Sequence, residues 1–532
     1  MLGPPKVRRL DQPIAVSLED LVPADHFYRY LDAKLDLSFV RVWVQDHYAT
    51  SGRPSIDPVV FFKLQLILFF EGLRSERKLM ETATLHLAHR WYLGYQLDEP
   101  LPDHSSLTRI RNRLGLAIFQ RFFEYVVELC QQAGLVWGEE LIFDGTKVQA
   151  NAAIDSLRSR WSARARTHLD ALFAGDAPGP APWALPADAE VPLMETAVEI
   201  APATAVVPPT ATPDAPPRLP FAGSVEDEAR LAVANAAAWR LLDERRRDPN
   251  QPSSSRGYRR LSDDKVSPTD PDATPMRRFT GDLPTLGYHD HYVIDGGKGR
   301  IILAALVTPA DVMDNTPMLD LFHRVCFRWR LHPDRVVGDA KYGTIANIRR
   351  LEETNVRAYL PMPEMGRRFG FYGADEFRYD ADRDEYVCPQ GQRLTFERVK
   401  YTEDVAVYRG DPGVCWECPV RMACTDSFDG RIIQRSVFSA YIERVKGYYE
   451  TAAYQKAMRK RKVWIEPLFG EAKEWHGLRK FRLRGLWKAN CEGLRIAAGQ
   501  NLKRWLSRTG WGRRHGPAGS LTLSHRGLSV LI

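Results

Sequence analysis

The chain has 532 residues, 44% of them hydrophobic and 11% aromatic, with a net charge of +7. This composition is typical of a packed globular protein with room for several domains. Seven cysteines in a chain of this length exclude a disulfide scaffold. The longest apolar run, residues 61–70, contains Lys63 and is too short to span a bilayer. Because residues 1–11 also lack the apolar core of a signal peptide, we expect a cytoplasmic protein without membrane association.

The positive charge is concentrated near the C-terminus. Residues 455–514 contain 17 Lys and Arg against four Asp and Glu, a local charge of +13, so the rest of the chain carries −6. Aromatic residues such as Trp475 and Trp487 are interleaved with these cations, a pattern that indicates contact with a polyanion. The alternative is a solvated basic helix, as charge runs often are.

Residues 1–130 are predicted to form an all-helical domain, because apolar residues recur at helical spacing from residue 59 onward. Ser55 is expected to cap the helix over 59–68, and Asp103 marks the start of a basic helix. Short helices ending in a basic one resemble helix-turn-helix DNA-binding units, although other small bundles share the spacing. The cations predicted to contact DNA here are Arg109, Arg111 and Arg113.

Residues 131–364 alternate between strand and helix patterns. A strand over 140–143 ends at Asp144, and basic helical sequence is expected up to about residue 173. Residues 174–255 are Pro-rich or loop-like and are predicted to be a largely disordered insert and linker. A hairpin over 287–307, a helix over 316–329 and a strand ending at Asp339 follow. This order of elements predicts an α/β fold with an RNase H-like mixed sheet.

Residues 365–440 are predicted to form a separate, Cys-rich insert. A Cys-x-x-Cys pair with two further cysteines predicts a structural zinc site, and the Cys-Pro-x-Gly turn is similar to the knuckle of a zinc ribbon. Redox pairing is the alternative for such a pair. Residues 441–510 are predicted to be the helical end of the core, and residues 511–532 a flexible tail. The predicted ligands are Cys388, Cys415, Cys418 and Cys424.

Three acidic residues are the candidate catalytic groups. Asp144 and Asp339 each end an apolar run, and Glu466 follows the apolar residues 463–465. A carboxylate at the end of a buried strand is unfavourable without a partner, and Mg²⁺ is held by a few carboxylates together with water and phosphate oxygens. Two aspartates at strand ends and a later glutamate therefore predict a two-metal site for phosphodiester chemistry. The alternative is that each Asp only forms a turn.

Glu466 lies four residues after Lys462 and seven before Lys473, so all three are predicted to share one helical face. Pro467 indicates that Glu466 sits at a helix start or kink. Glu471 and Glu474 are the next candidates, and all three acids could instead be ordinary partners on a solvated helix.

His289 and His291 alternate along the predicted hairpin and therefore point to one face. They could be ligands or phosphate contacts, and we expect a solvent-facing pair instead.

Residues 461–473 (RKVWIEPLFGEAK) and 478–486 (LRKFRLRGL) resemble bacterial insertion-sequence DDE transposases, in the subgroup with a cysteine-bearing insert. Glu466 and Lys473 match the spacing of the last two positions of a Tyr, Arg, Glu, Lys signature, whereas Arg459 and Lys462 stand at its first two. The similarity extends over residues 25–510 apart from the Pro-rich insert.

The resemblance implies an enzyme that cleaves transposon ends and transfers the freed strand into target DNA. Asp144, Asp339 and Glu466 would hold two Mg²⁺, for which Mn²⁺ can substitute. The implied partners are double-stranded DNA, as terminal inverted repeats and target, and a second copy of the chain, close to the bacterial nucleoid. The alternatives are a domesticated, inactive DNA-binding regulator and another RNase H-like nuclease such as a resolvase. The DNA contacts expected in the C-terminal region are Lys462, Lys473, Arg479, Lys480, Arg482 and Arg484.

Overall fold

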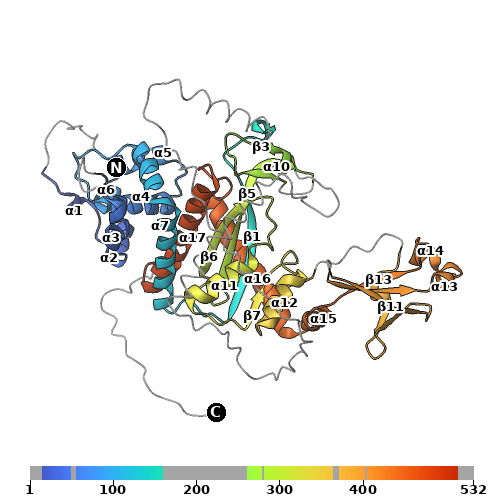
Figure 1. Ribbon diagram of the computed structural model, residues 1–532. Coiled ribbons are helices and arrows are strands. Elements are labelled where there is room, and N and C mark those ends of the chain that lie inside the picture. The colour runs from blue at the N-terminus through green and yellow to red at the C-terminus, as the bar shows by residue number, and fades with distance from the viewer. Residues whose placement is uncertain are drawn as a thin grey trace, which may run out of the picture.

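The structure is a computed structural model in which residues 15–48, 55–159, 261–277, 281–362, 371–401 and 404–512 are described. The predicted Pro-rich insert, most of the preceding basic segment and nearly all of the predicted tail lie outside these residues. Figure 1 shows a helical N-terminal region beside a central sheet, with a second, smaller sheet at the far end of the molecule.

The N-terminal region is helical, as predicted. Asp57 caps α4 through the backbone N–H of Val59, so the cap is not Ser55; Pro58 in the first turn gives up an N–H that would have no helical partner anyway. Asp103 caps α7 as expected, and Gly115, at φ +67°, kinks that helix. The helices are α1 (Leu18–Leu21), α2 (Phe27–Lys34), α3 (Phe39–Val44), α4 (Pro58–Phe70), α5 (Glu76–Leu85), α6 (Leu87–Leu93) and α7 (His104–Gln132).

The central sheet is mixed and runs in the order β4-β5-β1-β7-β8, with β6 also paired to β5. Pairing is antiparallel from β4 and β6 through β5 to β1, and parallel from β1 through β7 to β8. The strands are β1 (Glu140–Gln149), β4 (Thr274–Met276), β5 (Thr285–Asp295), β6 (Ile302–Pro309), β7 (Arg335–Val337) and β8 (Arg357–Tyr359).

Strand β1 is longer than the sequence pattern indicated. It continues through Asp144 to Gln149, because β5 pairs with it along its whole polar half. Residues 150–159, expected to be helical, contain only a short 3-10 turn and β2 (Arg158–Ser159), which pairs with β3 (Lys265–Val266). α10 (Leu261–Asp264) directly precedes β3.

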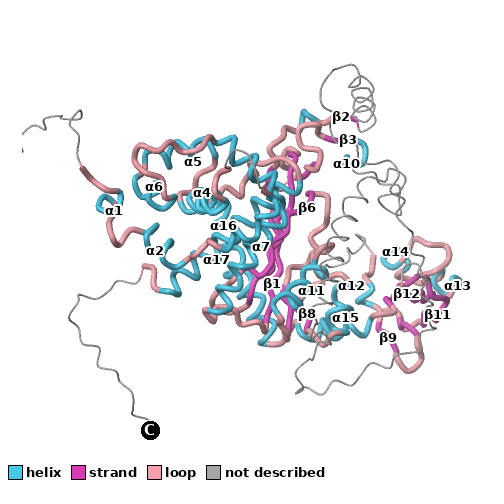
Figure 2. Tube along the Cα trace, turned by 60° about the vertical axis from the view of Figure 1, so that its left-hand side comes forward, coloured by secondary structure: helices cyan, strands magenta, loops and turns pink. Residues whose placement is uncertain are grey.

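Five helices complete the core. α11 (Met318–Trp329) packs on β5 and β6, and α12 (Ile345–Glu353) and α15 (Ser439–Tyr448) pack beside β8. α16 (Ala452–Trp475) crosses β1, β7 and β8, whereas α17 (Leu486–Thr509) lies between β6 and the N-terminal helices α4 and α7 (Figure 1). The turned view in Figure 2 shows the N-terminal helices and the Cys-rich insert on opposite sides of the central sheet. One continuous apolar core contains residues of the N-terminal helices, the central sheet and α17.

Helix α17 covers the outer edge of β6. The side-chain amide of Asn490 bonds both the N–H and the C=O of Val307, at 2.8 Å each, and Asn501 bonds both groups of Ile302 at 2.9 and 2.8 Å. Eleven helical residues and five strand residues both span about 16 Å, so the two amides match the strand's repeat. The helix thereby satisfies an edge that otherwise invites pairing with another chain.

The Cys-rich insert is a five-stranded antiparallel sheet in the order β13-β12-β11-β10-β9, with a small core of its own that includes Phe377, Leu394 and Tyr408. Figure 1 shows it extending away from the central sheet. Its elements are β9 (Arg378–Asp380), β10 (Glu385–Val387), β11 (Arg393–Lys400), β12 (Val405–Gly410), α13 (Pro412–Trp416), α14 (Arg421–Cys424) and β13 (Ile432–Ser436).

We predict that Asn501→Ala lowers the free energy of unfolding by about 1–3 kcal/mol, because it leaves the buried N–H and C=O of Ile302 without partners. The measurement is urea denaturation followed by far-UV circular dichroism. Asn112→Ala, at an exposed position of α7, is the matched control and should change stability by no more than about 0.5 kcal/mol. Equal stability of the two variants would contradict the edge role of Asn501.

Candidate active site

The parallel pairing of β1 with β7 brings two of the predicted acids to neighbouring positions. Ile142 pairs with Val337, and Asp144 and Asp339 each follow two residues later. Side chains two residues apart along extended chain point to the same side. Their charges affect each other, since Asp339 contributes to raising the pKa of Asp144.

Asp144 lies in a largely buried position, with 15% of its side chain exposed. Burial raises the pKa of its carboxyl to about 6, against the opposing effects of Arg461 and the Gly145 amide. The Arg461 guanidinium, on α16, lies 3.3 Å from an Asp144 oxygen. Because β1 continues beyond Asp144, this residue does not form a turn there. Asp339 does accept a bond of 2.9 Å from the backbone N–H of Lys341, so the turn alternative describes its local geometry.

Three residues that the sequence analysis did not single out, Asp314, Lys341 and Tyr342, lie around this pair of acids. The Lys341 Nζ lies 2.7 Å from Asp314 Oδ2, and although burial opposes its charge, Asp314, Asp339 and Asp144 raise its pKa. Tyr342 is 2% exposed, and burial followed by the same carboxylates raises the pKa of its hydroxyl. The available signals were an acid in the loop directly after β6 and a Lys two positions after Asp339.

Helix α16 carries the third predicted acid. It continues through Pro467, so Glu466 does not lie at a helix start. Lys462, Glu466 and Lys473 share one face of this helix. Glu466 is exposed, and among the described residues no hydrogen bond or ion pair joins it to Asp144 or Asp339. The structure therefore brings two of the three acids together and places the third on the helix that supplies Arg461.

The other two acids of α16 are engaged elsewhere. Glu471 contacts Lys503 and accepts a 3.2 Å bond from Gln500, both on α17. Burial opposes its charge, but His476, Lys503 and Arg504 together hold the pKa of Glu471 below its usual value. Glu474 pairs with Arg479 at 2.6 Å on the surface. Neither carboxylate is directed at the Asp144 cluster.

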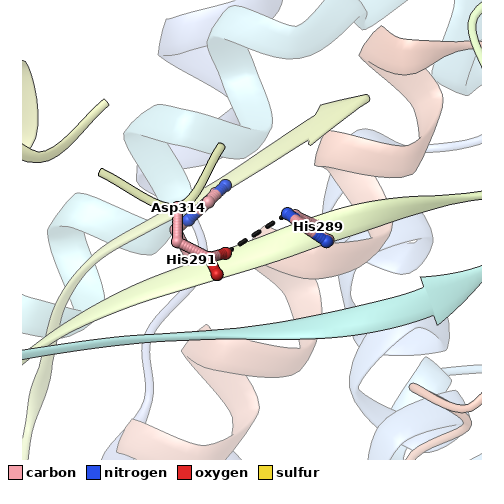
Figure 3. A group of neighbouring side chains, drawn as sticks. All are labelled: His289, His291 and Asp314. Carbon is pink, nitrogen blue, oxygen red and sulfur yellow. Dashed lines mark ion pairs between the residues drawn. The ribbon is translucent and has the colours of Figure 1, made fainter. Parts of the chain in front are cut away.

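His289 and His291 are buried, with 6% and 1% exposure, so the expected solvent-facing pair is wrong. Both lie on β5 and face Asp314, as Figure 3 shows. The two histidines do share one face of β5, but helices pack on the central sheet, so a polar face does not imply a solvent face.

Two of the predicted DNA contacts are corrected by the structure. Arg111 is 1% exposed and pairs with Glu76, and Arg482 pairs with Glu492 at 3.0 Å and with Glu76 at 3.6 Å. These guanidiniums join α5, α7 and α17 inside the protein. Lys473 is half-buried beside Asp290. The remaining predicted contacts are exposed, namely Arg109, Arg113, Lys462, Arg479, Lys480 and Arg484.

The four cysteines of the insert are free thiols and line one pocket. Burial raises the pKa of Cys424, and the other three cysteines raise it further, whereas Arg431 lowers it. The backbone N–H groups of Gln390 and Gln392 each donate to the Cys388 sulfur at 3.3 Å, around Gly391 at φ +76°. These two bonds orient the Cys388 sulfur in the pocket that the other three cysteines also line.

Comparison with known protein families gives two matches. Residues 16–113 match a transposase domain family (DUF772), and residues 387–506 match a transposase DDE domain family. The second match contains the four cysteines and Glu466, whereas Asp144 and Asp339 lie between the two. Neither the curated proteins nor the solved structures include a significant match. Within the described residues, no helix is both long and apolar enough to cross a bilayer. The two family matches support a transposase of the DDE type.

Proposed function

We propose that the protein is a DNA transposase that cleaves transposon ends and transfers the freed strands into target DNA, with an RNase H-like sheet as its catalytic core. The observation that supports the proposal is the β1–β7 register, because Asp144 lies two residues after Ile142 and Asp339 two residues after its partner Val337. The strand order from β6 through β5, β1 and β7 to β8 also supports this core.

Glu466 is the third acid of the proposed site. Of the three acids on α16, Glu471 and Glu474 are held in ion pairs, which leaves Glu466 as the carboxylate available for a ligand. Oxygen donors of this kind fit Mg²⁺ or Mn²⁺. Two such ions bound there would activate the attacking water or 3′-hydroxyl and stabilise the leaving oxygen.

Two cations contact the carboxylates of the proposed site and hold them in position. Arg461 keeps Asp144 against α16, and Lys341 bridges the space between Asp314 and the paired acids. A positive group beside the ligands also favours the approach of a DNA phosphate. The exposed cations Lys462, Arg479, Lys480 and Arg484 would extend this contact along the backbone.

A specific feature favours the alternative of an inactive DNA-binding regulator. The Arg461 guanidinium lies 3.3 Å from an Asp144 oxygen, so it already neutralises a carboxylate that a metal ion would neutralise in an active enzyme. In that alternative, DNA binding persists and the carboxylates serve only structure.

We further propose that the active form is a cytoplasmic dimer, because joining two transposon ends requires two sites.

Substituting the paired acids separates the two functions. We predict that Asp144→Asn and Asp339→Asn each lower the rate of end cleavage at least about a hundredfold, because even outer partners of metal ligands cost about 10–100-fold when lost. The assay uses a duplex carrying the DNA that flanks the gene, with Mg²⁺ present. Asp155→Asn, at an exposed acid on the 3-10 turn, is the control and should retain full activity. Unchanged cleavage in the Asp144 variant would refute the catalytic assignment.

DNA binding should depend steeply on salt. Removing a phosphate contact reduces the slope of log K against log salt by about 0.9. We therefore predict that Lys462→Ala and Lys480→Ala flatten the slope by about that amount each in a fluorescence anisotropy titration. Arg398→Ala, in the Cys-rich insert, is the control and should leave the slope unchanged. Equal slopes for all three variants would contradict the assignment of residues 455–514 to the DNA-binding surface.

We also propose that Cys388, Cys415, Cys418 and Cys424 bind a structural zinc ion. Because the core of the insert contains few apolar residues, we expect that metal removal unfolds the insert and leaves the central sheet folded. We predict that a strong chelator increases amide hydrogen exchange in β9–β13 and leaves β1 and β5 protected. Uniform protection across the insert, before and after chelation, would argue against the zinc site.

A further inference from the structure

A second group of potential metal ligands lies on the other side of β1 from Arg461. One ring nitrogen each of His289 and His291 and one carboxylate oxygen of Asp314 lie within 4.8 Å of one another, and all three residues are buried. Figure 3 shows the two imidazoles on β5 with the Asp314 carboxylate between them. Among the described residues, this is the one group of three such side chains found at that spacing.

One ring nitrogen of this group lacks the partner that a buried polar atom normally has. The His291 Nδ1, on the side of Asp314, has no hydrogen-bond partner among the described residues. An unmade hydrogen bond at a buried polar atom costs about 1–3 kcal/mol. A bound ion would satisfy such lone pairs, because neutral imidazole binds metals through them.

The hydrogen bond of His291 prepares one nitrogen for an ion. Its Nε2 lies 2.9 Å from the Thr308 hydroxyl. When Nε2–H donates to that oxygen, the lone pair is on Nδ1, which faces the cluster. Metal-binding histidines are commonly oriented in this way by a bond from their second nitrogen.

The spacing of the other two ligands also fits a single ion. His289 Nδ1 lies 3.2 Å from Asp314 Oδ1. Two ligands at about 2.0–2.1 Å from one tetrahedral zinc ion are about 3.3 Å apart. Without an ion, the same spacing is an ion pair between Asp314 and a protonated His289, and this is the rival explanation.

Gly145 leaves space for the cluster. A Cβ at this position would come within 3.0 Å of Asp314 Oδ1 and 3.2 Å of His291 Nδ1. Asp144 and Gly145 are consecutive on β1, so they point to opposite faces, one to α16 and the other to this cluster. Any side chain larger than hydrogen would crowd the two ligand atoms.

We propose that His289, His291 and Asp314 form a binding site for a divalent transition-metal ion, separate from the Asp144 and Asp339 site and from the cysteine site. Two imidazoles and one carboxylate suit zinc and its neighbours in the first row rather than Mg²⁺, which prefers oxygen ligands. The site acts as a positioning element, because Asp314 binds Lys341 through its second oxygen. It does not depend on the protein being catalytically active.

Metal analysis of purified full-length protein tests the site. After chelation and reloading with zinc, wild-type protein should hold one more equivalent than His289→Gln or His291→Gln. His323→Gln, at a partly buried histidine of α11, is the matched control and should bind as wild type does. Equal zinc content in wild-type and both cluster variants, with native circular dichroism, would overturn the proposal in favour of the ion pair.

A measurement on wild-type protein keeps the test decisive if the variants do not fold. Cobalt-loaded protein is examined by X-ray absorption at the cobalt edge. Imidazole scattering from bound cobalt is expected, since neither the cysteine site nor the acidic site contains a histidine. A spectrum with only sulfur and oxygen neighbours would show that the cluster binds no ion.

Discussion

The parallel pairing of β1 with β7 is the constraint on which the candidate site depends. Three paired residues on each strand set the register, and they carry Asp144 and Asp339 to the same level of the sheet. A slip of one residue would turn one carboxylate to the opposite face. Antiparallel pairing with β5 along the whole of β1 resists such a slip. Asp339 lies two residues beyond the end of β7, and its charge reaches Asp144, whose pKa it helps to raise.

Burial then gives this pair its chemistry. The Asp144 carboxylate is largely buried, and Asp339 and Asp314 add like charge nearby, against which Arg461 from α16 supplies a positive charge. Lys341, from the loop after β7, lies next to the same carboxylates. Neither cation removes the effect of burial, since the pKa of Asp144 stays raised to about 6. An incomplete compensation of this kind is common at functional sites, where a bound ligand supplies the missing charge.

Sequence patterns were sufficient for elements whose cause is local. The helix of residues 58–70 follows from an apolar run with Asp57 and Pro58 at its start, and the hairpin of β5 and β6 follows from alternation around Gly296. Properties set by partners distant in sequence were not predictable. Arg111 and Arg482 look like surface cations, yet Glu76 and Glu492 draw them inside. His289 and His291 alternate as an exposed pair would, yet they are buried beside Asp314 and Thr308. Asp314 lies in the loop after β6 and belongs to no recognisable sequence motif. Its place beside the histidines could not be predicted, because it depends on the path of that loop.

The two faces of β1 are therefore coupled through consecutive residues. Asp144 faces α16 and its cations, whereas Gly145 faces the histidines and Asp314. Lys341 connects the two sides, because it binds Asp314 directly and its charge also responds to Asp144 and Asp339. A change in the net charge of the histidine cluster, by an ion or by a proton, would thus alter how strongly Asp314 holds Lys341. The acids on the other face would then experience a different local field, without any movement of the strand that carries them.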